Sequence, residues 1–224
     1  MFELPVCPWL PPGDRCRLVT GPESRVSATP AAKEATAQHE TLFGRFDRRV
    51  DGFFEAHLRG RAGADVVMYG ASALGEHSFL WLVLAGAKGW RAGTGWAGLA
   101  RASAVLAAES LLVNGIIKSF FRRQRPQHEG PRPLPLRTPK SSSFPSGHAS
   151  AAFFSAALLR GSGKGWPLYY LLAALVSASR VHVRIHHASD VLAGAAFGAV
   201  LGELARRRVS LAPPCGTSVR ARAF

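Results

Sequence analysis

Cysteine is scarce in this sequence, which has three in 224 residues: Cys7, Cys16 and Cys215. Their spacing fits neither a disulfide framework nor a zinc site, so neither is expected to hold the fold together. Acidic residues are also few, 14 against 28 lysines and arginines, which leaves a formal charge of +14. An excess of this sign favours anionic partners such as lipid headgroups, phosphate esters or nucleic acid.

The distribution of the basic residues argues against nucleic acid as a partner. A nucleic-acid surface needs basic and aromatic residues interleaved on a soluble face, whereas here the basic clusters flank apolar runs. The mean hydropathy, +0.07, is low for a membrane protein. This average hides several long apolar runs, because polar ends and a polar central loop dilute them.

Both ends of the chain differ in composition from its middle. Residues 1–38 are rich in proline, glycine, serine and threonine and have no usable periodicity, so we expect them to be poorly ordered. They also lack the basic start and apolar core of a standard signal peptide. The expected organisation is completed by a membrane-embedded domain over residues 39–208 and a polar tail over 209–224.

The apolar pattern predicts helices throughout the middle of the chain. From residue 40 to about 58, apolar residues recur at helical spacing among charges, which indicates an amphipathic lid or interfacial helix. Runs at 66–87 and 97–117 have the length of about 20 residues that a bilayer requires. The expected fold is all-α: a membrane-embedded bundle of about five spanning helices plus the amphipathic N-terminal helix. The remaining three helices are expected at 147–159, 167–181 and 189–205.

Polar residues interrupt the first two apolar runs. Glu76 and His77 lie in the middle of the first, and Glu109 and Asn114 lie in the second. Polar groups are costly in hydrocarbon and should face the interior of the bundle. We expect these residues to be buried and hydrogen-bonded in a structural role, in preference to a catalytic one.

A short stretch near the end of the sequence has residue types suited to phosphate chemistry. Arg180, His186 and Asp190 have the spacing R-x(5)-H-x(3)-D. His186 and Asp190 are four residues apart, so in a helix they would share one face. The carboxylate could then fix the imidazole tautomer and leave the other nitrogen as a nucleophile, while the arginine holds phosphate oxygens. A helix end with a satisfied histidine and a solvated ion pair would have the same pattern.

Two upstream segments strengthen the catalytic interpretation. Lys118 and Arg125 have the spacing K-x(6)-R-P, and Ser146, Gly147 and His148 belong to the sequence P-S-G-H. Taken singly, the lysine could be an ordinary interface residue and the serine a plain helix start. In this order the three segments resemble the signature motifs of the type 2 phosphatidic acid phosphatase superfamily, which also contains bacterial class A acid phosphatases and vanadium haloperoxidases. The resemblance covers roughly residues 118–202, and every signature position is matched.

The resemblance implies a role for each matched residue. His186 attacks phosphorus to give a phosphohistidine, and Asp190 orients it. His148 protonates the leaving group and then activates water. Cationic side chains and the amino terminus of a helix hold the phosphate, and no metal or other cofactor is implied. The implied phosphate-binding residues are Lys118, Arg125, Ser146, Gly147 and Arg180.

Several neighbours of the motifs lie outside the signatures. We interpret His182 and His187 as supporting or structural residues, with His187 the closer of the two to substrate. Arg122, Arg123 and Arg184 could extend the positive field towards a second phosphate, or they could face lipid headgroups or solvent.

Alternating helix directions would bring the three motifs to one side of the membrane. The opposite side would carry basic residues and a belt of tryptophans, and the positive-inside rule makes that side cytoplasmic. We therefore expect a multi-pass protein of the inner (plasma) membrane with its active site on the outer face. The residues of the opposite side are Lys88, Arg91, Arg160, Lys164 and Arg206 to Arg208, with Trp90, Trp96 and Trp166.

The expected function is that of a metal-independent phosphatase acting on a phosphate monoester or diphosphate of a lipid or polyprenyl substrate. A vanadate-dependent haloperoxidase is one alternative, but the resembled haloperoxidases are soluble. A catalytically silent membrane anion-binding protein is another, although binding alone would not need His148, His186 and Asp190. The motifs do not choose among lipid phosphates, because groove shape sets tail selectivity, and they predict no oligomeric state.

Overall fold

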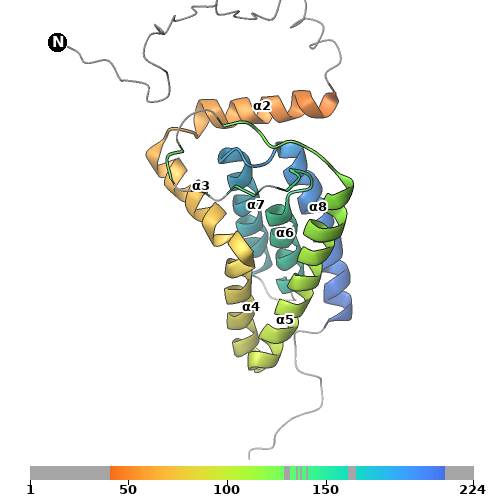
Figure 1. The fold of residues 1–224 in the computed structure, drawn as a ribbon. Helices are drawn as coiled ribbons and strands as arrows, with labels where there is room; N and C mark the ends of the chain where they lie inside the picture. The colour runs from red at the N-terminus through yellow and green to blue at the C-terminus, as the bar shows by residue number, and fades with distance from the viewer. Residues whose placement is uncertain are drawn as a thin grey trace, which may run out of the picture. The chain divides into compact units, whose positions relative to one another are not determined.

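The structure is a computed structural model that describes residues 41–128, 132–134, 136, 138–139, 141–160 and 165–209. The predictions for residues 1–38, and for the tail after residue 209, concern residues outside this description. Within the described part every regular element is helical, which confirms the all-α class (Figure 1). The α-helices are α2 Leu42–His57, α3 Ala62–Leu74, α4 Phe79–Arg91, α5 Gly95–Ser110, α6 Gly147–Leu159, α7 Trp166–His182 and α8 Ala188–Arg208.

Two helical stretches are long and apolar enough to cross a membrane. Helix α5 continues through a π-helical turn, Leu111–Ile116, and a 3-10 turn, Ile117–Phe120, so that the first stretch is Gly95–Phe120. The second is α8, and α6 is a shorter apolar helix. The predicted segments at 97–117 and 189–205 are thus present as long apolar helices, while the number of five spanning helices stays a prediction.

The apolar run at 66–87 does not form the single helix that its length predicts. The chain leaves α3 at Leu74, makes a 3-10 turn at Glu76–Ser78 and starts again as α4. His77 and Ser78 have left-handed backbone angles, with φ of 50° and 59°. A regular helix cannot pass through such residues, so the prediction of one continuous span is wrong here.

The predicted amphipathic helix is present as α2 and lies across one end of the bundle (Figure 1). Thr41 caps it by accepting a hydrogen bond from the Gly44 N–H at 3.2 Å. Its inner face packs Val50 and Phe54 against a buried cluster that α6, α7 and α8 supply. Helix α2 therefore covers the end of the bundle at which α7 ends and α8 begins.

Helices α6 and α8 pack closely because glycines of α8 face the backbone of α6. Gly194 and Gly198, which the spacing predicts as a small-residue packing face, are joined by Gly202. A Cβ atom at Gly194 would overlap the carbonyl oxygen of Ser146, and one at Gly198 would overlap that of Ser150. This contact fixes the start of α6 against the start of α8, where two of the three motifs lie.

The end of the bundle opposite α2 carries the predicted basic and aromatic groups, except Lys164, which lies outside the described residues (Figure 1). Trp90 and Trp96 meet edge to face, with ring centroids 6.4 Å apart. The Nζ of Lys88 donates to the carbonyl oxygen of Leu159 at the end of α6. The expected separation of the motifs from this end is therefore confirmed, and the orientation in a membrane stays a prediction.

Candidate active site

All three motifs meet at one cavity of about 610 Å³ at the end of the bundle near α2. Of the eight residues predicted from the motifs, five line this cavity, and the other three are buried. The lining comes from the α3–α4 break, the end of the α5 stretch, the loop after it, the start of α6 and the α7–α8 loop. The five lining residues are Lys118, Arg125, Gly147, His148 and His186, and the buried three are Ser146, Arg180 and Asp190.

His186 is held in place by the backbone at the end of α7. The N–H groups of Ile185 and His186 both donate to the carbonyl oxygen of Arg180, at 3.2 Å each. The imidazole is only 2% exposed, and its Nε2 lies 3.2 Å from Nη1 of Arg125. Burial lowers the pKa of His186 to about 4, so the ring is neutral at neutral pH and Nε2 can carry a free lone pair.

Ser143 bridges the predicted pair of His186 and Asp190. The His186 Nδ1 and Asp190 Oδ2 atoms are 3.8 Å apart, longer than a hydrogen bond. The Ser143 hydroxyl donates to this Oδ2 at 2.5 Å and lies 3.5 Å from Nδ1. The N–H of His187 donates to the same carboxylate oxygen at 2.9 Å. Asp190 thus acts on the imidazole through a buried serine that none of the motifs includes.

The second oxygen of Asp190 leads outward to α2. Arg123 donates through Nη1 to Asp190 Oδ1 and through Nη2 to Asp47 Oδ2, both at 2.6 Å. Asp47, buried on the inner face of α2, also accepts from the N–H of Ser189 at 2.7 Å and from its hydroxyl at 2.8 Å. The positive charge of Arg123 is therefore paired with two carboxylates.

The first turn of α6 presents Gly147 and His148 to the cavity. Nε2 of His148 is buried and has no hydrogen-bond partner among the described residues. The side chain of Asn114 packs against Gly147, where a Cβ atom would overlap the amide. The Ser146 hydroxyl instead caps α6 by accepting from the Ala149 N–H at 3.4 Å.

Three cationic groups lie around His186. Lys118 lies in the last turn of the α5 stretch and lines the cavity. Arg125 is anchored by donating to the carbonyl oxygens of Ile185 at 3.0 Å and Ser142 at 3.2 Å. Arg180 is 1% exposed and donates to the hydroxyl of Ser72, while its Nε has no partner among the described residues.

The structure buries only some of the polar residues of the first two apolar runs. Glu109 is buried and accepts a hydrogen bond from the Ser150 hydroxyl, as predicted. Glu76 is only half-buried, and His77 and Asn114 are exposed, so the prediction that these three are buried is wrong. The break between α3 and α4 turns Glu76 and His77 towards the cavity, which Asn114 also lines.

The neighbouring histidines have structural contacts. Nε2 of His182 lies 2.7 Å from Asp65 Oδ1, in accordance with its expected structural role. His187 is the N-cap residue of α8, in a capping box with Asp190. Arg184 pairs with Glu55 of α2 at 2.9 Å.

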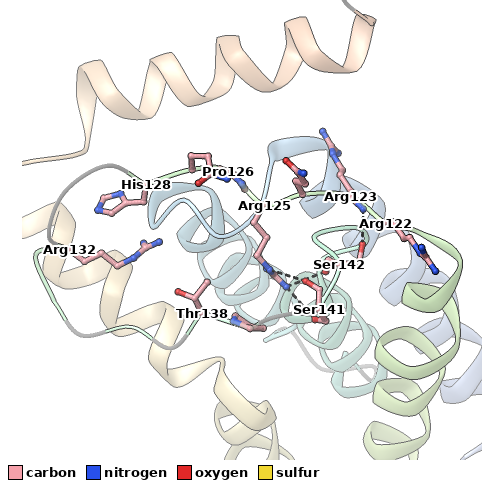
Figure 2. Close-up of a pocket in the computed structure, with 12 residues that line it drawn as sticks. Arg122, Arg123, Arg125, Pro126, His128, Arg132, Thr138, Ser141 and Ser142 are labelled. Atoms are coloured by element: carbon pink, nitrogen blue, oxygen red, sulfur yellow. Dashed lines mark hydrogen bonds between the residues drawn. The ribbon is translucent and has the colours of Figure 1, made fainter. Parts of the chain in front are cut away.

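A second cavity, of about 600 Å³, shares part of its wall with the first (Figure 2). Four residues line both cavities: Arg125, Thr138, Pro139 and Ser141. In Figure 2 the Arg125 side chain extends from the loop towards Ser141 and Ser142, with Arg132 and His128 on one side of it. Arg125 therefore lies between His186 and this second cavity.

Comparison with known proteins agrees with this geometry. Residues 98–212 match the PAP2 superfamily. The chain is 36% identical over 159 residues to decaprenylphosphoryl-5-phosphoribose phosphatase of Mycobacterium tuberculosis, a match that covers 67% of this chain and 83% of that protein. It is 32% identical over 149 residues to phosphatidylglycerophosphatase B of Bacillus subtilis, covering 60% and 70% respectively.

A solved structure has the same fold. The crystal structure of a transmembrane PAP2 type phosphatidylglycerolphosphate phosphatase from Bacillus subtilis superposes with a TM-score of 0.59 at 28% identity, covering 78% of this chain and 89% of that one. Fold and site together define an integral membrane phosphoric ester hydrolase. The chain belongs to the PAP2 superfamily.

Proposed function

We propose that this protein removes phosphate from a phosphate monoester or diphosphate of a lipid or polyprenyl alcohol, without a metal, through a phosphohistidine at His186. The observation that carries the proposal is the position of His186 Nε2. It belongs to a neutral, backbone-fixed imidazole, lies at the cavity and is 3.2 Å from the Arg125 guanidinium. An incoming phosphate held by that guanidinium would stand next to the lone pair.

In the first step His186 Nε2 attacks phosphorus, and the bond to the leaving oxygen breaks with its electron pair. His148, in protonated form, gives a proton to that oxygen. Lys118, Arg125 and Arg180 stabilise the charge on the phosphoryl oxygens. The Ser143 hydroxyl oxygen accepts a hydrogen bond from the Nδ1–H of His186, which keeps the ring in the reactive tautomer.

In the second step water attacks the phosphohistidine. His148, now neutral, takes a proton from the water as the new oxygen–phosphorus bond forms and the nitrogen–phosphorus bond breaks. Inorganic phosphate leaves, and both histidines return to their starting protonation states. Nε2 of His148 is buried at the cavity and has no partner among the described residues, so a phosphate oxygen of the substrate would be its hydrogen-bond partner and would favour the protonated ring.

A third cavity supports a substrate with an apolar chain. It has a volume of about 1070 Å³ and lies between α2, the segment 121–123 and the first turns of α8. Its wall is mainly apolar, while Arg122 and Arg123 connect it to the polar cavity of Figure 2. We assign it to the chain of the substrate, whose headgroup would extend to the motifs. Its apolar lining residues include Leu42, Phe43, Phe46, Phe121, Phe144 and Leu192.

We place the protein in the plasma membrane with the site at the outer face. Basic residues and tryptophans gather at the opposite end, among them the exposed Trp90 and Trp96, and the positive-inside rule assigns that end to the cytoplasm. The relatives named above are phosphatases, and nothing in the site favours a haloperoxidase.

The test is phosphate release in detergent with a chelator present. A panel of lipid and polyprenyl phosphates is offered to the wild type and to His186→Ala. The proposal predicts release by the wild type that collapses in the variant. Equal release by both proteins, or none by either on any substrate, would refute it.

A further inference from the structure

The cavity in Figure 2 is strongly basic, and of its lining residues only Arg125 and Pro126 are signature positions of the motifs. No aspartate or glutamate is among its described lining residues. Arg123 is neutralised by Asp47 and Asp190. Nη1 of Arg132 donates a hydrogen bond to the Val183 carbonyl oxygen, and the other guanidinium nitrogens have no partner among the described residues.

His128 is the residue of this cavity that most strongly indicates a binding site. Both of its ring nitrogens are buried, and neither has a hydrogen-bond partner among the described residues. Buried polar atoms are nearly always paired, and an imidazole left with two unpaired nitrogens is unusual. Since His128 lines the cavity, its imidazole is available to a ligand that enters it.

Arg125 connects this cavity to the reaction site, because it lines both spaces and lies 3.2 Å from His186 Nε2. A ligand that spans the shared wall would place one anionic group at the nucleophile and a second one against His128 and Arg132. Arginine forks and imidazole N–H groups are well suited to phosphate oxygens.

We propose that this cavity binds a second phosphate of the substrate headgroup, beyond the phosphoryl group that is removed. The inference rests on the proposed function and narrows it to headgroups with two phosphates. A polyprenyl diphosphate has such a group, and so does a sugar phosphate joined to the lipid by a phosphodiester. A lipid monophosphate leaves His128 unpaired.

The experiment compares substrates that share one prenyl chain: the monophosphate, the diphosphate and the phosphodiester-linked sugar phosphate. Phosphate release is measured with the full-length wild type and with His128→Gln, which breaks no described hydrogen bond. We expect the kcat/KM ratio of a two-phosphate substrate to the monophosphate to fall about tenfold in the variant. The substrate on which the ratio falls identifies the headgroup.

Arg49→Gln is the matched control, because Arg49 is exposed on α2 and lines none of the described cavities. It removes one positive charge, and the ratio should stay at the wild-type value. A ratio unchanged in His128→Gln on every substrate, or an equal fall in Arg49→Gln, would overturn the inference.

A binding measurement separates this inference from the proposed function. Methylene diphosphonate and inorganic phosphate are titrated into the wild type and into His128→Gln by calorimetry. We expect the variant to bind the diphosphonate about tenfold more weakly and phosphate as before. If the wild type released no phosphate from any substrate, the proposed function would fail. The binding comparison would still decide whether this cavity binds a second phosphate. Equal weakening for both ligands, or for neither, would contradict the second phosphate site.

Discussion

Arg123 donates to Asp190 at 2.6 Å, so a residue that is not a signature position holds the carboxylate that the last motif supplies. The other branch of the same guanidinium reaches Asp47 of α2. Helix α2, which covers the end of the bundle, is therefore connected to Asp190 through the Arg123 guanidinium. The hydrogen-bonded route from Asp190 onward to His186 runs through the Ser143 hydroxyl, so each member of this chain has a separate consequence.

Removal of the link to α2 should lower kcat. In Arg123→Gln the buried Asp190 loses a charged partner, and we expect kcat to fall about tenfold or more with a smaller change in KM. Arg123→Lys should recover part of the loss. In a double-mutant cycle with Asp47→Asn, steady-state kinetics should show non-additive effects, because the two residues share one ion pair. Strictly additive effects would contradict the connection.

Ser143→Ala should reduce turnover because it removes the bridge between Asp190 and the imidazole. We expect kcat to be lower by about tenfold, with the free energy of unfolding changed by no more than about 1–3 kcal/mol. Ser155→Ala is the matched control: this buried serine of α6 donates only to the carbonyl oxygen of Ala151. The bridge has no role if both variants retain wild-type kcat.

The nucleophile should stay neutral well into the acid range. Burial lowers the pKa of His186 to about 4, so protonation should remove the free lone pair only as the pH falls through that value, and not near 6.5. The measurement is an NMR titration of protein labelled with ¹⁵N in histidine, in which the signal absent from His186→Gln identifies the residue. A midpoint near 6.5 for that signal would contradict the buried, cation-flanked environment.

The close contact of α6 and α8 makes a prediction for stability. Gly198→Val places a side chain against the Ser150 carbonyl oxygen and should lower the free energy of unfolding by about 1–3 kcal/mol. Gly70→Ala is the control, because a Cβ atom on that α3 residue would meet nothing within 4 Å. This substitution should raise the free energy of unfolding by at most about 1 kcal/mol. Thermal unfolding in detergent compares the two, and similar melting curves would argue against the packing.

The motifs and the apolar periodicity predicted much of this architecture. The start of α6 follows from P-S-G-H, because a serine before a glycine and an apolar run is a helix start, and α6 covers the expected residues 147–159. The positions of Lys118, Arg125 and His148 at one cavity follow from alternating helix directions. These features depend on local sequence and chain direction.

The features that sequence reasoning missed depend on tertiary contacts. Ser143 and Arg123 contact Asp190 only after distant segments fold together. In the sequence, Asp47 cannot be distinguished from the other charged residues of an amphipathic helix, although it pairs with Arg123. The break at Glu76–Ser78 has no glycine or proline at its left-handed residues, so the apolar run looks continuous. The unusual polar triplet in mid-run was the one available signal, and it marked residues that line the cavity.

The central claim is a covalent phosphate on His186. The most direct measurement incubates the protein with substrate labelled with ³²P in the terminal phosphate, quenches in alkali, where phosphohistidine survives, and maps the label by peptide digestion. We predict label on the peptide that contains His186, none in His186→Gln, and more in His148→Gln because the second step needs its base. Substrate turnover by the wild type without label on that peptide, together with retained activity in His186→Gln, would contradict the account.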